Sequence, residues 1–425
     1  MRMPTGNPRL MKEINKSMIL ELIKAREHIS RADIAKELHI SPPTVSKIID
    51  QLLAEKWIME IGTGVSSGGR KPLLLKFNAR RAFTVGAWVG DTVLMAAVAD
   101  LNGQILLKRE VKRPPEKEKA KSDDHSKKEF QLDKELILLI YRTLRDANIP
   151  AGKLCSIGVA VCGITRMEGG IVVRSRHLPG WENYPIQEVL EKEFSVPVVI
   201  DGDSFMAVLG EAWRGAGMGV RHLVRITIGA GIGCGILLDE RVYRGADGAA
   251  GEIGDMIVAD TLPAQALAER GGYLERAVGL SALVDAAGSM WAEKGRSSLL
   301  STWCDNDPER LTAEMIFKAA VAEDELALSL VENLCEALAR VIVNIVSFIN
   351  PEEVIIGGEL GEARRLILQK VNNRVKELLC TPPPILLSSL DRDAELYGAI
   401  SLALARVMPS VEVSYASSVL DRASD

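Results

Sequence analysis

Residues 30–53 constrain the fold more than any other part of this 425-residue chain. Their apolar residues recur every three or four positions in two short runs, as expected for two amphipathic helices. The runs consist of Ile34 and Leu38, then Val45, Ile48, Ile49 and Leu52. Between them, Ser41 can cap the second helix and Pro42 suits its first turn. Two short helices joined by a tight turn predict a helix-turn-helix.

The second of these helices carries short polar and basic residues on its outer side. Thr44, Ser46 and Lys47 are of the right kind to meet a phosphate or a base edge in the major groove of DNA. Arg31 and Ser41, at the starts of the two helices, complete this candidate DNA-binding set. An ordinary helical hairpin in a bundle can show the same pattern, so the interpretation depends on the residues that come next in the chain.

The segment directly after these helices predicts a wing. A short alternating strand at residues 56–61 precedes the Gly/Ser-rich stretch 62–72, and a second apolar strand covers residues 73–77. Arg70 and Lys71 lie near the end of this stretch. Glycine allows close approach to phosphates, and arginine suits a narrow minor groove. A flexible solvent loop is the alternative, but the basic end directly after a helix-turn-helix favours a wing.

The charge distribution agrees with a DNA-binding head. Residues 1–80 hold 14 Lys and Arg against 8 Asp and Glu, a net charge of +6, whereas the whole chain carries −5. The remainder therefore carries −11. A basic head on an acidic body is typical of a DNA-binding module joined to a part that binds a small or neutral ligand.

Other features exclude several classes of protein. There is no run of 18 apolar residues and no apolar secretory core, so we expect a cytoplasmic protein without a membrane span. The six cysteines are scattered and form no CxxC pair, and histidines number only five. Neither a disulfide framework nor a His/Cys metal site is predicted.

The middle of the chain predicts an α/β region. Residues 85–111 read as three strands in a meander, with a hairpin signal at Asn102-Gly103. The charged, low-complexity stretch 114–129 predicts a disordered surface insertion. The elements expected after it are a helix at 132–147, a buried strand at 156–162, a strand at 197–200 and a helix at 204–213.

The second half contains a glycine-rich hairpin and a candidate cleft. In residues 224–235 two strands flank a turn in which Gly229, Gly231 and Gly233 alternate, a pattern that can cradle phosphate but also suits a tight hairpin. In the loop 245–256, Glu252 and Asp255 lie three residues apart and could face one cleft. Helices are expected within 308–349, a strand at 351–358 and a closing helix at 397–407.

Four motifs together resemble the repressor branch of the ROK family (repressors and sugar kinases). The motifs are SSGGRKP (66–72), LPGWENYP (178–185), IGAGIGCGILLDERVYRGADGAAGEIGDM (228–256) and NPEEVIIGG (350–358). The resemblance implies an N-terminal winged helix-turn-helix followed by two actin/hexokinase-like (ribonuclease H-like) α/β lobes with a ligand cleft between them. We assign 1–80 to the winged helix, 81–203 to the first lobe and 204–396 to the second. The closing helix 397–408 is expected to pack back on the first lobe.

The resemblance also indicates what this chain has lost. The first phosphate loop of the family reads Asp-X-Gly-Gly-Thr, and here Trp88 replaces the metal-facing acid and Asp91 replaces a glycine. Tryptophan cannot orient Mg²⁺, and a second carboxylate repels a nucleotide. Gly229, Gly231 and Gly233 would then form a vestigial nucleotide loop, and no catalytic residue is expected.

The sugar-binding positions are partly retained. By resemblance they fall on Asp203, Glu252, Asp255 (in place of a histidine) and Glu275. The family holds a structural zinc with that histidine and three cysteines, and their counterparts here are Asp255, Ala266, Ala268 and Tyr273. Because this set includes no thiol, neither zinc nor any other cofactor is expected.

These observations favour a DNA-binding transcriptional regulator of carbohydrate-utilisation genes. The resemblance implies a repressor, and the residues themselves leave repression and activation both open. Its expected partners are double-stranded operator DNA, a carbohydrate or sugar-phosphate effector, and a second copy of the chain in a homodimer or dimer of dimers. Two alternatives stay open. One is an ATP-dependent sugar kinase with an attached DNA module. The other is a regulator whose effector site is degenerate and whose body serves dimerisation or a protein partner.

Overall fold

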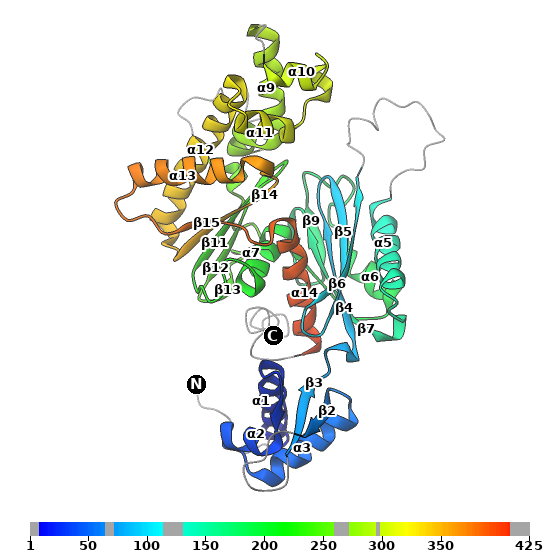
Figure 1. The fold of residues 1–425 in the computed structure, drawn as a ribbon. Helices are drawn as coiled ribbons and strands as arrows, with labels where there is room; N and C mark the ends of the chain where they lie inside the picture. Colours follow the sequence, from blue (N-terminus) through cyan, green and yellow to red (C-terminus); the bar gives the residue numbers. More distant parts are fainter. Residues whose placement is uncertain (1–7, 64–71, 114–130, 259–271, 295–297, 409–425) are drawn as a thin grey trace.

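The computed structural model describes residues 8–63, 72–113, 131–258, 272–294 and 298–408. A small N-terminal head lies below a body of two lobes, each built on its own five-stranded sheet (Figure 1). The predicted insertion 114–129 and the predicted wing tip, with Arg70 and Lys71, lie outside the described residues. Within the described part, no helix combines the length and apolarity needed to cross a membrane.

The head is a winged helix with a small antiparallel sheet of order β1-β3-β2. Its elements are α1 (Pro8–Ala25), β1 (Ile29–Ser30), α2 (Arg31–Glu37), α3 (Pro42–Ala54), β2 (Ile58–Thr63) and β3 (Leu73–Phe77). The predicted apolar set is buried except for the half-buried Leu38, and Ile19 and Ile23 of α1 complete the core. The predicted helix-turn-helix is therefore confirmed as a structure.

Two details of the head differ from prediction. Ser41 occupies the position before α3, but its side chain caps no backbone N–H and instead lies 2.8 Å from the Thr44 hydroxyl. The side-chain cap is made at the preceding helix, where Ser30 accepts from the Asp33 N–H. Strand β1 was not predicted, because two residues carry no periodicity and become a strand only by pairing with β3.

The first lobe contains the predicted meander. Its sheet has the order β10-β7-β4-β5-β6, with β7 parallel to both of its neighbours. The strands are β4 (Phe83–Val89), β5 (Val93–Asp100), β6 (Ile105–Lys112), β7 (Leu154–Val161) and β10 (Val198–Gly202), and the helices α5 (Leu132–Asp146) and α6 (Ile186–Phe194) lie on the outer face (Figure 1). A hairpin of β8 (Ile164–Arg166) and β9 (Ile171–Arg174) extends from β7.

The second lobe has the sheet order β13-β12-β11-β14-β15. Its strands are β11 (Leu223–Ile228), β12 (Ile232–Leu238), β13 (Arg241–Val242), β14 (Glu353–Gly358) and β15 (Ile385–Leu387). Its helices are α8 (Tyr273–Val278), α9 (Leu280–Lys294), α10 (Leu299–Trp303), α11 (Ala313–Val321), α12 (Glu325–Ile349) and α13 (Arg364–Leu378). Apolar residues of α11, α12 and α13 form one core with β11 and β14.

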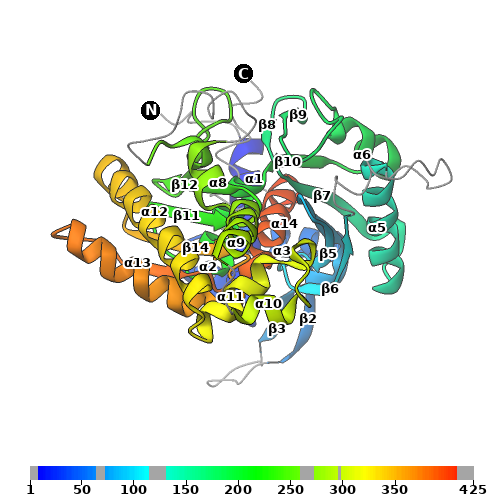
Figure 2. The same ribbon diagram turned by 90° about the horizontal axis from the view of Figure 1, so that it is seen from above.

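Two helices fill the space between the sheets. They are α7 (Asp203–Arg214) and α14 (Ala394–Val407), and α14 lies between the two sheets in both views (Figures 1 and 2). Their backbones touch at glycine, since a Cβ on Gly398 would lie 1.8 Å from the Met206 oxygen and one on Gly210 would lie 2.1 Å from the Ala394 oxygen. Glycine at these two positions is therefore required by the packing.

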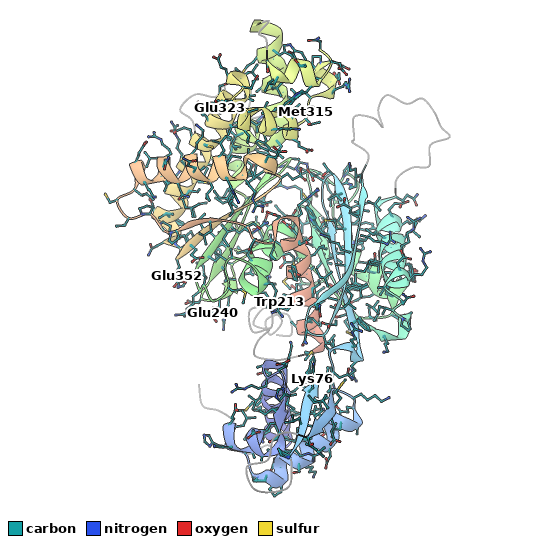
Figure 3. The ribbon with its side chains drawn as sticks, in the orientation of Figure 1. Lys76, Trp213, Glu240, Met315, Glu323 and Glu352 are labelled. Atoms are coloured by element: carbon teal, nitrogen blue, oxygen red, sulfur yellow. The ribbon has the colours of Figure 1, made fainter. Side chains whose placement is uncertain are left out.

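The head is packed against the end of α14. Val407 and Met408 line a small cavity together with Lys16 of α1 and with Trp57, and the buried residues of the head form one apolar core with those of α7 and α14. The Arg81 guanidinium lies 4.1 Å from the centre of the Trp57 ring. Trp213, labelled in Figure 3, lies near the C-terminal end of α7.

Candidate functional site

A cavity between the two lobes, here called the interlobe cavity, brings most of the predicted ligand residues together. It encloses about 960 Å³ when the space open to solvent is included. Asp203, Glu252 and Glu275 line it, and so do three glycines of the β11–β12 turn: Gly229, Gly231 and Gly233. Asp255 does not line the cavity, and its carboxylate accepts a hydrogen bond from Arg176 at 2.7 Å.

Asp203 is positioned by the change from strand to helix. It is the first residue of α7 and directly follows β10, so its side chain projects from the sheet edge into the interlobe cavity. The backbone N–H of Ser204 donates to its Oδ1 at 2.8 Å. Burial, and then the nearby negative charge of Glu395, raise the pKa of Asp203 to about 7. At neutral pH this carboxyl can therefore both donate and accept hydrogen bonds.

The other two acids come from the second lobe. Glu252 follows Gly251, whose φ of +84° and close approach to the Cys234 oxygen require glycine at the turn. Burial raises the pKa of Glu252, and the neighbouring Arg176 partly opposes this shift. Glu275 lies on α8, with its Oε1 4.0 Å from Nε2 of His177. The cavity is thus an acidic site with several acceptors for hydroxyl groups.

A basic segment of the first lobe, missed in the sequence, also lines the interlobe cavity. Arg174, Arg176 and His177 lie at the end of β9 and in the loop after it. They directly precede the motif at residues 178–185. Their concentration in four residues was the one available signal, because nothing in the local pattern indicates which way a loop arginine points.

The first phosphate loop is occupied by aromatic and acidic side chains. Trp88 is the second-last residue of β4 and is 9% exposed. Its ring packs against Gly90, where an added Cβ would lie 3.0 Å from the indole. Trp88 and Asp91 both line the interlobe cavity. The indole N–H lies near the Asp203 carboxyl and slightly lowers its pKa, yet Nε1 has no partner at hydrogen-bonding geometry among the described residues.

A buried ionic cluster joins β11 of the second lobe to the two helices α7 and α14. Arg225 of β11 is fully buried and lies 3.4 Å from Glu395 of α14 and 3.8 Å from Glu211 of α7. Its Nη1 also donates to the Thr227 hydroxyl at 2.5 Å. Glu395 also lines the cavity, and its second oxygen, Oε2, has no hydrogen-bond partner among the described residues.

The residues present do not fit the zinc site that the resemblance implies. The Asp255 carboxylate is engaged by Arg176, and Tyr273 is a buried phenol rather than a thiol. Ala266 and Ala268 lie outside the described residues and have no donor atom in their side chains. Across the ranges that the structure describes, no three His, Cys, Asp or Glu side chains gather where they could hold a metal ion.

The head presents part of the predicted DNA-binding set. Thr44, Ser46 and Lys47 all lie on α3. Thr44 and Lys47 are exposed, and Ser46 is half-buried. Arg31 donates to Asp50 at 2.8 Å and lies 3.9 Å from Glu60, so its charge is already neutralised within the head. A contact of Arg31 with DNA phosphate would have to compete with these two carboxylates.

A winged helix-turn-helix joined to a two-lobed α/β body with a polar interlobe cavity defines a class of DNA-binding, ligand-binding proteins. Residues 84–406 match the ROK family, and residues 13–59 match a winged helix-turn-helix DNA-binding domain. The chain belongs to the ROK family, as its motifs predicted.

Similar proteins include both regulators and kinases. A protein named putative xylose repressor from Caldicellulosiruptor sp. (strain Rt8B.4) is 29% identical over 87% of this chain and 89% of its own. The DNA-binding transcriptional dual regulator NagC of Escherichia coli (strain K12) is 25% identical, covering 93% and 94%. A glucokinase of Halalkalibacterium halodurans is 30% identical but covers only 68% of this chain, and 83% of its own.

Solved structures agree with the fold. A ROK family transcriptional regulator described as a homologue of the E. coli MLC protein superposes with a TM-score of 0.75 at 24% identity, over 95% of this chain and 99% of that one. A ROK family glucokinase from Streptomyces griseus gives a TM-score of 0.64 at 23% identity, over 76% and 99%. The regulator covers the head as well as the lobes. The predicted fold class is confirmed, and the activity has to be argued from the residues of the site.

Proposed function

We propose that this protein is a sugar-responsive transcriptional repressor that binds operator DNA through its winged helix. The observation that carries the proposal is the convergence of Asp203, Glu252 and Glu275 in a cavity of the body to which the head is packed. Relatives that match almost the whole chain, head included, are named as xylose and N-acetylglucosamine repressors. The glucokinase relative, by contrast, covers about two thirds of it.

The chemistry of the interlobe cavity suits a polyhydroxylated ligand. Carboxylates accept hydrogen bonds from hydroxyl groups, and such bonds to an ionised group are stronger than neutral ones. Asp203, with a pKa near 7, can take either role toward a sugar hydroxyl. A ligand whose hydroxyl groups hydrogen-bond to these buried carboxylates would displace the water that otherwise bonds to them.

Phosphoryl transfer is the second candidate function, because the glycine turn at 229–233 is intact and a kinase is among the relatives. Two side chains argue against it. Trp88 stands where the family places the metal-facing acid, and an indole offers no ligand to Mg²⁺. Asp91 adds a negative charge where phosphates would lie. Since catalysis of phosphoryl transfer is mostly positioning and charge stabilisation, we propose that the body is not an enzyme.

Helix α14 offers a physical route from ligand to DNA. Glu395 in its first turn lines the interlobe cavity, whereas Val407 at its end and Met408 just beyond it contact the head. A helix of 14 residues spans roughly 20 Å. Closure of the lobes around a ligand would shift α14 and, with it, the head.

We further propose that the protein acts as a homodimer or a dimer of dimers. A single winged helix makes few phosphate contacts, and two heads on a two-fold axis read two half-sites one helical turn apart. Because dimer partners must hold their heads at a fixed spacing, even a small movement of α14 would change the fit to DNA.

The proposal is tested by two measurements on the full chain. Duplexes selected from a randomised pool should bind in a salt-dependent manner, and a thermal-shift screen over sugars should give at least one stabilising ligand. A coupled assay with ATP, Mg²⁺ and the same sugars should give no turnover. Turnover that is lost in Asp203→Asn would establish the kinase instead. Stabilisation by no sugar at all would favour a body that serves only dimerisation or a protein partner.

A further inference from the structure

Three side chains that line the interlobe cavity each have a buried polar atom with no hydrogen-bond partner among the described residues. These atoms are the indole N–H of Trp88, the Nε–H of Arg392 and Oε2 of Glu395. None of them belongs to the three acids Asp203, Glu252 and Glu275 or to the glycine turn. Buried polar groups in folded proteins are normally satisfied by protein, water or ligand. Two donors and one acceptor left open beside one cavity therefore point to something that binds there.

Trp88 and Glu395 define a second region of the cavity, next to the first region, which is formed by Asp203, Glu252 and Glu275. Trp88 lies near the end of β4 of the first lobe, and Glu395 lies in the first turn of α14. The negative charge of Glu395 contributes to the raised pKa of Asp203. Glu252 and Glu275 come from the opposite lobe, beside Arg176 and His177. Asp203 thus lies where the two regions meet, so one molecule can touch both.

The charge of the second region disfavours an anion. Four carboxylates line it, from Asp91, Glu359, Asp391 and Glu395, together with the guanidinium of Arg392. Nη2 of Arg392 donates to Glu359 at 2.9 Å, whereas its Nε–H has no partner among the described residues. Burial and the charge of Asp91 raise the pKa of Glu359, while Arg392 lowers it. A phosphoryl group here would meet four carboxylates and a single guanidinium, which is shared with one of those carboxylates.

Neutral hydroxyl groups fit the same region well. The N–H of Trp88 can donate to a sugar oxygen, and Oε2 of Glu395 can accept from a hydroxyl. The indole ring, fixed against Gly90, adds the apolar surface that ligand pockets usually combine with a few placed polar groups.

We infer that the effector is a neutral ligand of two linked sugar units, a disaccharide or a similar glycoside. One ring binds at Asp203, Glu252 and Glu275, and the second binds at Trp88 and Glu395. This inference rests on the proposed function and narrows its ligand class, from carbohydrate or sugar phosphate to an uncharged molecule larger than a monosaccharide.

The test compares matched ligands by titration calorimetry on the full chain. D-xylose, D-glucose and N-acetylglucosamine are each compared with the disaccharides built from two of the same unit in every available linkage, and with their phosphate esters. We expect one disaccharide to bind at least about ten-fold tighter than its monosaccharide, and the phosphate ester to bind more weakly than the free sugar.

Variants locate the second unit. Trp88→Phe keeps an aromatic ring but removes the N–H, and should weaken the disaccharide about three- to ten-fold, the loss expected for one hydrogen bond, while the monosaccharide changes less than about two-fold. Glu395→Gln should act in the same direction. Trp213→Phe makes the same chemical change outside the cavity and should alter neither affinity. Asp203→Asn should weaken both ligands.

The outcomes separate this inference from the proposed function. A monosaccharide that binds, with no disaccharide of the same unit binding tighter, overturns the two-unit ligand but leaves a sugar-responsive regulator. A phosphate ester that binds tightest overturns the uncharged ligand. Equal loss of both affinities in Trp88→Phe overturns the second region by placing the indole in the first. Binding of no sugar, with DNA binding intact, removes the sugar effector altogether.

Discussion

Replacing glycine by alanine should have opposite effects on stability at two helical glycines, one at the contact between α7 and α14 and one outside it. Gly398 lies in α14 where a Cβ would be 1.8 Å from the Met206 oxygen, and Gly288 lies in α9 where a Cβ would meet nothing within 4 Å. Replacement of a glycine inside a helix by alanine normally stabilises by about 1 kcal/mol. The change Gly288→Ala should therefore raise the free energy of unfolding by about that amount.

At Gly398 the same methyl group has no room. Real Cβ atoms essentially never approach heavy atoms closer than 3.0 Å, so the two backbones would have to separate by about 1.2 Å. Forcing extra volume into a packed core costs about 1–3 kcal/mol, and here the obstacle is backbone, which cannot rotate away as a side chain can. Because the obstacle is backbone, we expect a packing cost of about 3 kcal/mol. The gain of about 1 kcal/mol from replacing glycine in a helix offsets part of this cost, so Gly398→Ala should lower the free energy of unfolding by about 2 kcal/mol.

Thermal unfolding of the two variants beside wild type measures this difference directly. Gly288→Ala should unfold at a higher temperature than wild type and Gly398→Ala at a lower one. Because α14 also reaches the head, Gly398→Ala should in addition reduce the effect of sugar on DNA affinity, whereas Gly288→Ala should not. A Gly398→Ala protein as stable as Gly288→Ala would refute the close packing of α7 against α14, and with it the proposed route of coupling.

Three further predictions concern DNA, pH and metal. Lys47→Ala and Arg70→Ala should each weaken duplex binding and lower the slope of log affinity against log salt by about 1, whereas Lys376→Ala on α13 should change neither; an unchanged slope would remove that residue from the interface. Asp203 has a pKa raised to about 7 in the folded protein, so its ionisation destabilises wild type progressively between about pH 4 and pH 7. The stability of Asp203→Asn relative to wild type should accordingly rise over that range and level off above it, and a difference independent of pH would contradict the burial of this carboxyl. Elemental analysis of purified protein should find less than one zinc per chain; a full equivalent would mean that the metal ligands lie elsewhere.

Local periodicity was enough to predict the head and most of the sheets. The two helices of the helix-turn-helix follow from the apolar spacing in residues 30–53, and the meander follows from alternation interrupted at Asn102-Gly103. Strand β1 and the β8–β9 hairpin escaped, because strands of two to four residues owe their existence to pairing partners rather than to their own pattern.

The candidate site was predictable only where motifs carried it. Asp203, Glu252 and Glu275 were placed by family resemblance, and the structure brings them to one cavity. Asp255 was expected to face the ligand, but a side chain 79 residues earlier, Arg176, takes its carboxylate. Such long-range ion pairs leave no trace in local spacing.

The role of Glu395 was equally hidden from the sequence. Its acidic side chain in an apolar closing helix is paired with the buried Arg225. The pair is joined by the fold, since 170 residues separate the two along the chain.

The control that the interlobe cavity exerts on the head can be measured in a single experiment. Fluorescence anisotropy of a selected duplex should be recorded with and without the stabilising sugar, for wild type and for Glu252→Gln. We predict that sugar changes the dissociation constant for DNA about 5- to 150-fold in wild type, the usual range of allosteric coupling, and that Glu252→Gln requires far more sugar for the same change. A sugar that demonstrably binds the wild-type cavity, yet leaves its affinity for DNA unchanged, would contradict the coupling of cavity to head.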